Sequence, residues 1–276
     1  MKALGILAWK EVQRGIRNRW VVATTLLMLA LSLSIAFLGS APTGTLGAAR
    51  LSVTVVSLSS LTIFLIPLIA LMLAYDAVIG EVENGTMLLL LTYPVARWQV
   101  IVGKFLGHTA ILAAATIVGY GAAGLAVGLA EESTEVAVWL SLATMTGSSV
   151  VLGTVFLTLG YLISVLARER GTAAGLAVAV WLLFVLLFDM GLLGVLVADK
   201  GATLKADAVS LLMMLNPADI YRMLNLTTSP EIAALSGMAS LGGRGALPPG
   251  VLVAALSAWA AVPLGLAALI FSRREL

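Results

Sequence analysis

The sequence of 276 residues contains no cysteine and a single histidine, His108. Disulfide bonds and thiolate metal sites are therefore excluded, and one chain cannot form a histidine-rich metal cluster. Charged residues are also scarce, at 11% of the chain, whereas an ordinary soluble domain has roughly a quarter. Hydrophobic residues make up 61%. A chain with this balance needs lipid as its solvent.

The sequence motifs of soluble enzyme chemistry are missing as well. The nearest match to the phosphate-binding motif G-x-x-x-x-G-K-[ST], at Gly103-Lys104-Phe105, lacks both the upstream glycine and the hydroxyl residue. Neither H-E-x-x-H nor G-x-S-x-G occurs. We therefore expect a non-catalytic protein that hydrolyses no ATP, contains no metal site and binds no cofactor of its own.

Long apolar runs are what the sequence has in place of these motifs. A helix needs about 20 mostly apolar residues to cross the hydrocarbon core of a bilayer. Six spans are predicted on this basis, at about 20–38, 52–75, 107–129, 138–166, 172–197 and 251–271. We predict an all-α membrane protein with a single domain over residues 1–276, in which segment 76–104 joins spans two and three and loop 198–250 joins spans five and six.

The distribution of Lys and Arg predicts the orientation of these spans. If the N-terminus is cytoplasmic, that side carries 11 of these residues and the other side 5. Basic residues beside spans are retained on the cytoplasmic side, so both termini are predicted to lie there. The first apolar run is too long for a cleaved signal peptide, which indicates an uncleaved first span.

Residues 4–20 alternate between apolar and basic side chains at helical spacing. Positions 4, 8, 12 and 16 are apolar, and Lys10, Arg14 and Arg17 lie opposite them. The pattern predicts an amphipathic helix in the membrane interface. The alternative is a basic flank that merely continues the first span.

Segment 76–104 is the most informative part of the chain. Asn84 or Thr86 is expected to cap a short helix, and Pro94 to begin a second helix that leads into span three. The apolar run 87–91 is far too short to cross a membrane. An apolar patch on a cytoplasmic helical hairpin favours contact with a protein partner.

The segment after span five is apolar for only half a span, at 208–215. Asn216 and Pro217 are expected to end one helix, and residues 219–226 to form another. We predict a re-entrant or interfacial segment on the outer face. The methionines of this region, which could offer thioether ligands to Cu(I), are interpreted as packing residues; they are Met213, Met214, Met223 and Met238.

One acid and the single histidine fall inside the predicted spans. Asp189 is the one acid there, and a charge at the centre of a span costs roughly 2.5 to 3.5 kcal/mol. It lies near the outer edge of its span, which leaves two alternatives: a partner in a translocation pathway, or an interfacial acid that pairs with a loop cation. His108, near the cytoplasmic end of span three, is interpreted as structural.

The order of these parts, with the stretches Gly80-Glu81-Val82-Glu83-Asn84-Gly85-Thr86 and Tyr93-Pro94-Val95-Ala96-Arg97, resembles the ABC-2 type transporter permeases. The resemblance implies that segment 76–104 docks into a separate ATPase, which binds ATP and Mg²⁺, and that two copies of the permease pair. The implied coupling residues are Glu81, Glu83, Gly85, Thr86 and Arg97.

A narrower resemblance covers nearly the whole chain, through residues 73–81, 88–94, 103–108, 173–176 and 215–222. These stretches are similar to the permeases that serve maturation of bacterial nitrous oxide reductase. The similarity implies a periplasmic partner subunit, a role in assembling copper centres and a place in the bacterial inner (plasma) membrane, with no nucleic-acid partner. The inferred contacts of the periplasmic partner are Asn216, Pro217, Asp219, Tyr221 and Arg222.

Two other functions stay open. One is an ABC-2 exporter of a lipid, drug or polysaccharide, and the other is a membrane scaffold or secondary transporter that needs no ATPase.

Overall fold

The computed structural model describes residues 2–38, 50–129, 136–199, 206–228 and 247–274, and within these ranges the chain is almost entirely helical with no strand. The helices of the first half are α1 (Lys2–Ile16), α2 (Arg19–Leu38), α3 (Arg50–Ala74), α4 (Ile79–Glu83), α5 (Thr86–Leu91) and α6 (Arg97–Gly128). Those of the second half are α7 (Val136–Leu166), α8 (Arg170–Leu182), α9 (Phe188–Asp199), α10 (Ala206–Met213), α11 (Pro217–Thr228) and α13 (Pro249–Arg273).

Six helical segments of the described chain are long and apolar enough to cross a membrane, which confirms the predicted all-α protein with six spans. They are α2, α3 with α4, α6, α7, α8 with α9, and α13. The third helix is longer than its predicted span, since α6 begins at Arg97 rather than near residue 107. The chain is thus a multi-pass membrane protein.

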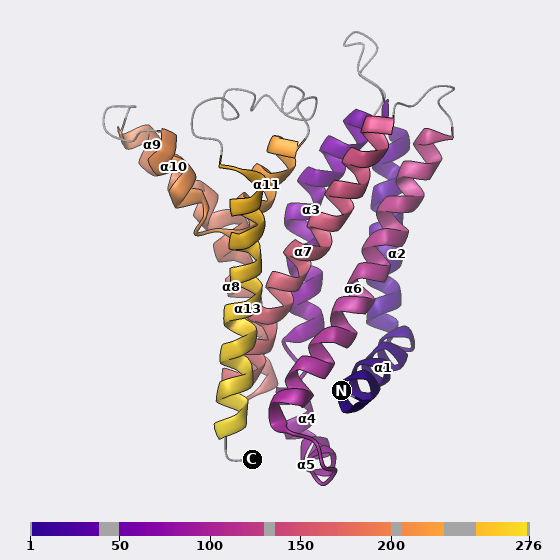
Figure 1. The fold of residues 1–276 in the computed structure, drawn as a ribbon, viewed down its shortest axis with the longest axis vertical. Helices are drawn as coiled ribbons and strands as arrows, with labels where there is room; N and C mark the ends of the chain where they lie inside the picture. Colours follow the sequence, from indigo (N-terminus) through magenta and orange to yellow (C-terminus); the bar gives the residue numbers. More distant parts are fainter. Residues whose placement is uncertain (1, 39–49, 130–135, 200–205, 229–246, 275–276) are drawn as a thin grey trace.

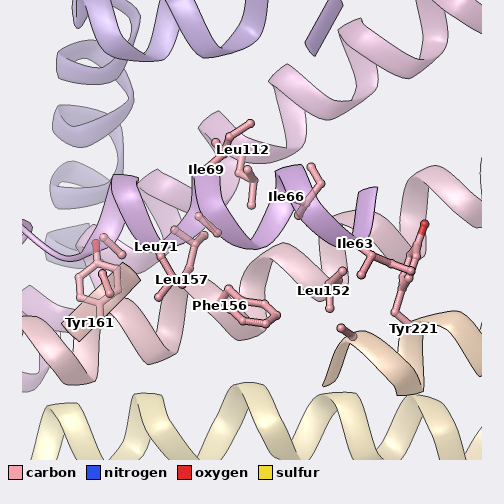
Figure 2. Close-up of a cluster of buried hydrophobic side chains, with 14 of the residues drawn as sticks. Ile63, Ile66, Ile69, Leu71, Leu112, Leu152, Phe156, Leu157, Tyr161 and Tyr221 are labelled. Carbon is pink, nitrogen blue, oxygen red and sulfur yellow. The ribbon is translucent and has the colours of Figure 1, made fainter. Parts of the chain in front are cut away.

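The core of the bundle lies between α3, α6 and α7 (Figure 2). Ile63 and Ile66 of α3 pack with Leu152 and Phe156 of α7, and Leu112 of α6 lies beside them. By contrast, most apolar side chains of α2, of α8 with α9, and of α13 face outward. Outward-facing apolar side chains are stable where lipid surrounds the bundle.

Helix α1 packs across α6 through glycines. A Cβ atom added to Gly103 would lie 2.7 Å from the Cβ of Leu7, and one added to Gly107 would lie 2.6 Å from the Cβ of Glu11. In return, Gly15 of α1 makes room for Ile111 of α6. Small residues at this spacing let two helices approach closely.

The two ends of the bundle differ (Figure 1). Helices α1, α4 and α5 lie at one end together with the last turn of α13, and α11 lies towards the other. We call the first the basic end, because it holds most of the described basic residues: Lys10, Arg14, Arg17, Arg19, Arg97, Lys104, Arg168, Arg170, Arg273 and Arg274.

Candidate functional site

A helical hairpin of α4 and α5 projects from the basic end (Figure 1). The turn between the two helices is at Gly85, whose φ of 69° is a left-handed conformation that favours glycine. Met87 anchors α5 with 1% of its surface exposed, while Leu88 and Leu89 are 58% and 67% exposed. Tyr93 extends this apolar surface at 67% exposure. The hairpin therefore presents an unpaired apolar face at the basic end.

Two predictions about this hairpin are wrong in detail. Neither Asn84 nor Thr86 caps a helix with its side chain, because the turn at Gly85 makes Thr86 the first residue of α5 and its hydroxyl donates to the carbonyl oxygen of Glu81. Pro94 does not begin the next helix. Helix α6 starts at Arg97, and Gln99 accepts a hydrogen bond from the backbone N–H of residue 96 at 3.1 Å.

A buried cluster of charges connects the hairpin to α1 and α6. Lys104 of α6 has 3% of its side chain exposed, and its Nζ lies 2.7 Å from Oε1 of Glu11 and 2.8 Å from Oε1 of Glu81. Arg14 of α1 also reaches Oε1 of Glu81, at 2.9 Å. One lysine therefore joins α1 to the hairpin of α4 and α5, with both glutamates at least nine-tenths buried.

Two aromatic rings support this charge cluster from the bundle side. His108 Nε2 lies 3.8 Å from Oε2 of Glu11, and His108 Nδ1 lies 2.7 Å from the hydroxyl of Tyr161 on α7. Burial raises the pKa of Glu11, but the neighbouring cations, Lys104 foremost, together outweigh burial and hold that pKa below its ordinary value. Glu11 is thus a carboxylate in the folded chain, and His108 has the structural setting that the sequence predicts.

A second set of contacts ties the other side of the hairpin to α8. Arg170 forms an ion pair with Asp76, and Oε1 of Glu83 accepts the backbone N–H of Arg170 at 2.8 Å. A carboxylate at the first residue of a helix satisfies a free N–H and meets the positive end of the helix dipole. Glu83 therefore caps α8 rather than its own helix, while its side chain stays exposed.

Arg97 holds the start of α6 to the end of the chain. Its guanidinium donates to the carbonyl oxygen of Arg274. Arg274 in turn donates to the carbonyl oxygen of Val165, at 2.7 Å, and to that of Ala167, at 3.2 Å. The basic end is therefore cross-linked between α6, α7 and α13.

A polar cavity of about 420 Å³ lies beside these clusters, between α1, α2, α3, α4, α6 and α8. Its wall includes Lys104, Arg14, Arg170 and Asp76, all of them already engaged in ion pairs. The described residues contain no group of three or more metal-ligating side chains that could hold a metal ion.

At the opposite end, a second polar cluster forms around α11. Asn216 caps this helix, since its Oδ1 accepts the N–H of Ala218 at 3.0 Å, and Pro217 is the first helical residue. The predicted helix break at Asn216 and Pro217 is confirmed. The Nδ2 of Asn216 also donates to the carbonyl oxygen of Phe184, at 2.9 Å, in a π-helical turn at Leu183–Leu187.

Arg222 of α11 joins two carboxylates. It lies 2.5 Å from Oδ1 of Asp219 and 2.9 Å from Oδ2 of Asp189 in the fifth span. Asp189 therefore has a cation as its partner, as expected for an interfacial acid. Burial raises the pKa of Asp219 to about 7, although Arg222 lowers it, and the nearby Asp189 raises it further.

Tyr221 and Asn225 hold α11 to the core. The hydroxyl of Tyr221 lies 3.1 Å from that of Ser149 on α7 and 3.4 Å from that of Ser59 on α3. The Nδ2 of Asn225 donates to the hydroxyl of Ser148 at 3.1 Å. Helix α11 is thus fixed to two spans by hydrogen bonds, of which those to α7 are buried.

The structure buries most of the five residues that are expected to contact an outer partner. Asn216, Pro217, Asp219 and Tyr221 are buried, and only Arg222 is partly exposed. The side chains of Asn216, Asp219, Tyr221 and Arg222 all pair inside the chain, and of the five residues Arg222 offers the accessible surface. Leu211 and Leu215, 60% and 58% exposed, form the accessible surface of this corner.

The five predicted coupling residues also separate by burial. Glu81 is 8% exposed, so its carboxylate positions the hairpin instead of presenting a surface. Gly85, Thr86 and Glu83 are exposed on the hairpin, and Arg97 is half-buried. Sequence reasoning missed Glu11 and Lys104, although Glu11 is the only acid among the basic residues of α1.

Comparison with known proteins gives one family. The family model described as ABC-2 family transporter protein matches residues 6–276. A relative from Stutzerimonas stutzeri, named "Probable ABC transporter permease protein NosY", is 46% identical over 97% of each chain. A relative of the same name from Pseudomonas aeruginosa is 45% identical over 100% of each chain.

Proposed function

The chain belongs to the ABC-2 transporter family and is a NosY-like permease, and we propose that it converts ATP hydrolysis by a separate ATPase into maturation of nitrous oxide reductase. In this role it is a non-catalytic subunit. A NosF-like ATPase binds ATP and Mg²⁺, and the permease transmits its closure to the outer face, where the copper centres of the reductase are assembled.

The exposed apolar face of α5 carries this proposal. Leu88, Leu89 and Tyr93 lie on a hairpin whose position is set by ion pairs, through Glu81 to α1 and α6 and through Asp76 to α8. Apolar groups at a protein interface are buried by the partner. A hairpin held in this way transmits a displacement of α5 to the spans. Coupling to an ATPase requires such transmission.

We assign the membrane orientation, a periplasmic subunit and a second copy of the chain from the exposed surfaces of the bundle. We place the basic end and both termini in the cytoplasm, because basic residues collect there, and the chain in the bacterial inner membrane. A NosD-like periplasmic subunit then meets the corner exposed at Leu211 and Leu215. A second copy packs on α8 and α9, where added Cβ atoms at Gly171, Gly175 and Gly191 would meet nothing within 4 Å.

Co-purification of the ATPase tests the coupling surface. We expect Leu89→Asp to reduce the ATPase retained by the detergent-extracted permease by roughly 10- to 100-fold, because burying one leucine contributes about 1.5 to 3 kcal/mol. Ser272→Asp is the matched control, since it adds the same charge at an exposed position of the basic end away from the hairpin. Equal retention of the ATPase by both variants would contradict the proposed surface.

Deletion of the permease separates this function from the alternatives. We expect loss of copper content and activity in the reductase. An ABC-2 exporter of a lipid, drug or polysaccharide would retain an ATPase but leave the reductase intact. A scaffold or secondary transporter would retain no ATPase in any variant, including the natural chain.

A further inference from the structure

Helix α1 has three faces rather than the two of a simple amphipathic helix. Leu7, Glu11 and Gly15 are buried against α6. A basic face of exposed side chains includes Lys10 and Arg17. A third face is apolar and exposed; it carries Trp9, at 62% exposure, and Ile16, at 66%.

A groove of about 330 Å³ lies along the apolar side of α1, where α1 meets α2 and α6. Val12 and Ile16 line it from α1, Leu26 from α2, and the small side chains of Ala110 and Ala114 line it from α6. Its one polar lining residue, Thr25, donates its hydroxyl to the backbone carbonyl of Val21 at 2.8 Å. The groove therefore offers no unpaired side-chain donor or acceptor and suits a hydrocarbon chain.

A basic pocket of about 580 Å³ lies on another face of the same helix. Its lining consists of Lys10, Gln13, Arg14, Arg17 and Asn18. Gln13 and Arg17 directly follow the groove residues Val12 and Ile16 in the chain, and consecutive residues of a helix point roughly 100° apart, so the pocket lies on the neighbouring face of α1. Among the described side chains, Lys10 and Arg17 form no ion pair, which leaves their charges available to an anion.

We propose that the groove and the basic pocket together bind one anionic phospholipid. Its acyl chain lies in the groove, and its phosphate is held by Lys10 and Arg17. A lipid fits better than a protein segment because α2 and α6 line the groove within their membrane-spanning parts, where lipid is the surrounding solvent. Cations that meet an anionic headgroup beside a span add to the burial of the acyl chain. This site does not depend on the proposed coupling to an ATPase.

Lipid titration of the delipidated full-length chain tests the site. Phosphatidylglycerol and phosphatidylcholine are added separately, and bound copies are counted by native mass spectrometry. We expect one phosphatidylglycerol to be retained per chain in preference to phosphatidylcholine. Lys10→Gln with Arg17→Gln should weaken phosphatidylglycerol binding about 30-fold, as two headgroup contacts are lost. Ala114→Phe should fill the groove and remove the bound copy.

The matched control changes the same charge at the same end of the bundle. Arg168→Gln with Arg273→Gln removes two exposed cations away from the groove, and we expect lipid binding to stay at the natural level. All the substituted positions are exposed, and gel filtration verifies that each variant is folded. If Ala114→Phe does not fold, Leu26→Trp fills the same groove instead. Equal retention of both lipids, equal loss in the two charge variants, or displacement of phosphatidylglycerol by inorganic phosphate would each overturn the proposal.

Discussion

Removing the buried lysine of the basic end should destabilise the permease more than any surface charge does. Lys104→Met leaves Glu11 without its main cation and leaves Glu81 only the partly exposed Arg14. Breaking a buried ion pair by deleting one partner costs about 3–5 kcal/mol. For a chain of this size the loss corresponds to a fall of roughly 6–20 °C in the thermal unfolding midpoint.

The control for this effect is the other cation of the cluster. The side chain of Arg14 is 60% exposed, and an exposed pair contributes less than about 1 kcal/mol. Arg14→Met should therefore shift the midpoint by only a few degrees. Thermal unfolding in detergent, followed by intrinsic fluorescence, compares the two variants directly. A Lys104→Met midpoint within 2 °C or so of the natural chain would refute the reasoning.

Neutralising the whole cluster separates charge from packing. Lys104→Met combined with Glu11→Gln and Glu81→Gln removes all three buried charges, and replacing a buried ion cluster by neutral side chains is often neutral for stability. We therefore expect the triple variant to regain most of the loss. If it is as unstable as Lys104→Met alone, the shape of lysine matters and its charge does not.

The pH dependence of stability gives an independent check on the role of the Lys104 charge. In the natural chain the pKa of Glu11 is lowered, so its contribution is present above the ordinary pKa of 4.5 and is lost as pH falls through the folded value. In Lys104→Met the same burial acts without the ammonium and raises that pKa. The variant then loses stability as pH rises, so its deficit should widen between about pH 5 and 8.

Two further predictions concern the outer cluster and the packing of α1. The folded pKa of Asp219, about 7, lies above its ordinary 3.8, so between these two values the folded chain binds more protons than the unfolded chain. The free energy of unfolding therefore falls as pH rises through this window, at up to about 1.4 kcal/mol per pH unit. Asp219→Asn should remove this pH dependence from thermal midpoints measured between pH 4.5 and 8. An added Cβ at Gly107 would lie 2.8 Å from a backbone oxygen of α1, so Gly107→Leu should lower the thermal midpoint. Gly5→Ala is the control and should leave the midpoint unchanged, because a Cβ there meets nothing within 4 Å. Equal midpoints for the two variants would contradict the close approach of α1 and α6.

The spans and the helix break before α11 could be predicted because their signals are local. A membrane span is a run of about 20 apolar residues, and its ends are visible in the charges that border it. Asn216 and Pro217 stand next to each other, and each has a strong preference for the start of a helix. The third span was predicted to begin only near residue 107 because Arg97 and Lys104 interrupt the apolar run, although they do not interrupt the helix.

The candidate sites were harder to predict because their members are distant in the chain. Lys104 meets Glu11 across 93 positions, and Asp189 meets Arg222 across 33. Sequence spacing within one helix indicates which residues share a face, but not which other helix covers that face. Glu81 was therefore expected to contact a partner, and only packing shows that α1 and α6 already bury it.

The scarcity of charged residues explains both why the spans could be predicted and why the candidate sites could not. In an apolar chain, a buried charge is retained only where an opposite charge compensates it. Within the described residues, buried Glu11, Glu81 and Lys104 compensate one another, and buried Asp219 has Arg222. Both sets lie towards the ends of the bundle, while polar groups of the core such as Thr62 and Tyr120 pair as neutral hydroxyls at 2.7 Å. Hydropathy therefore locates the spans, and the few buried charges mark the contacts that connect the spans to the shorter helices.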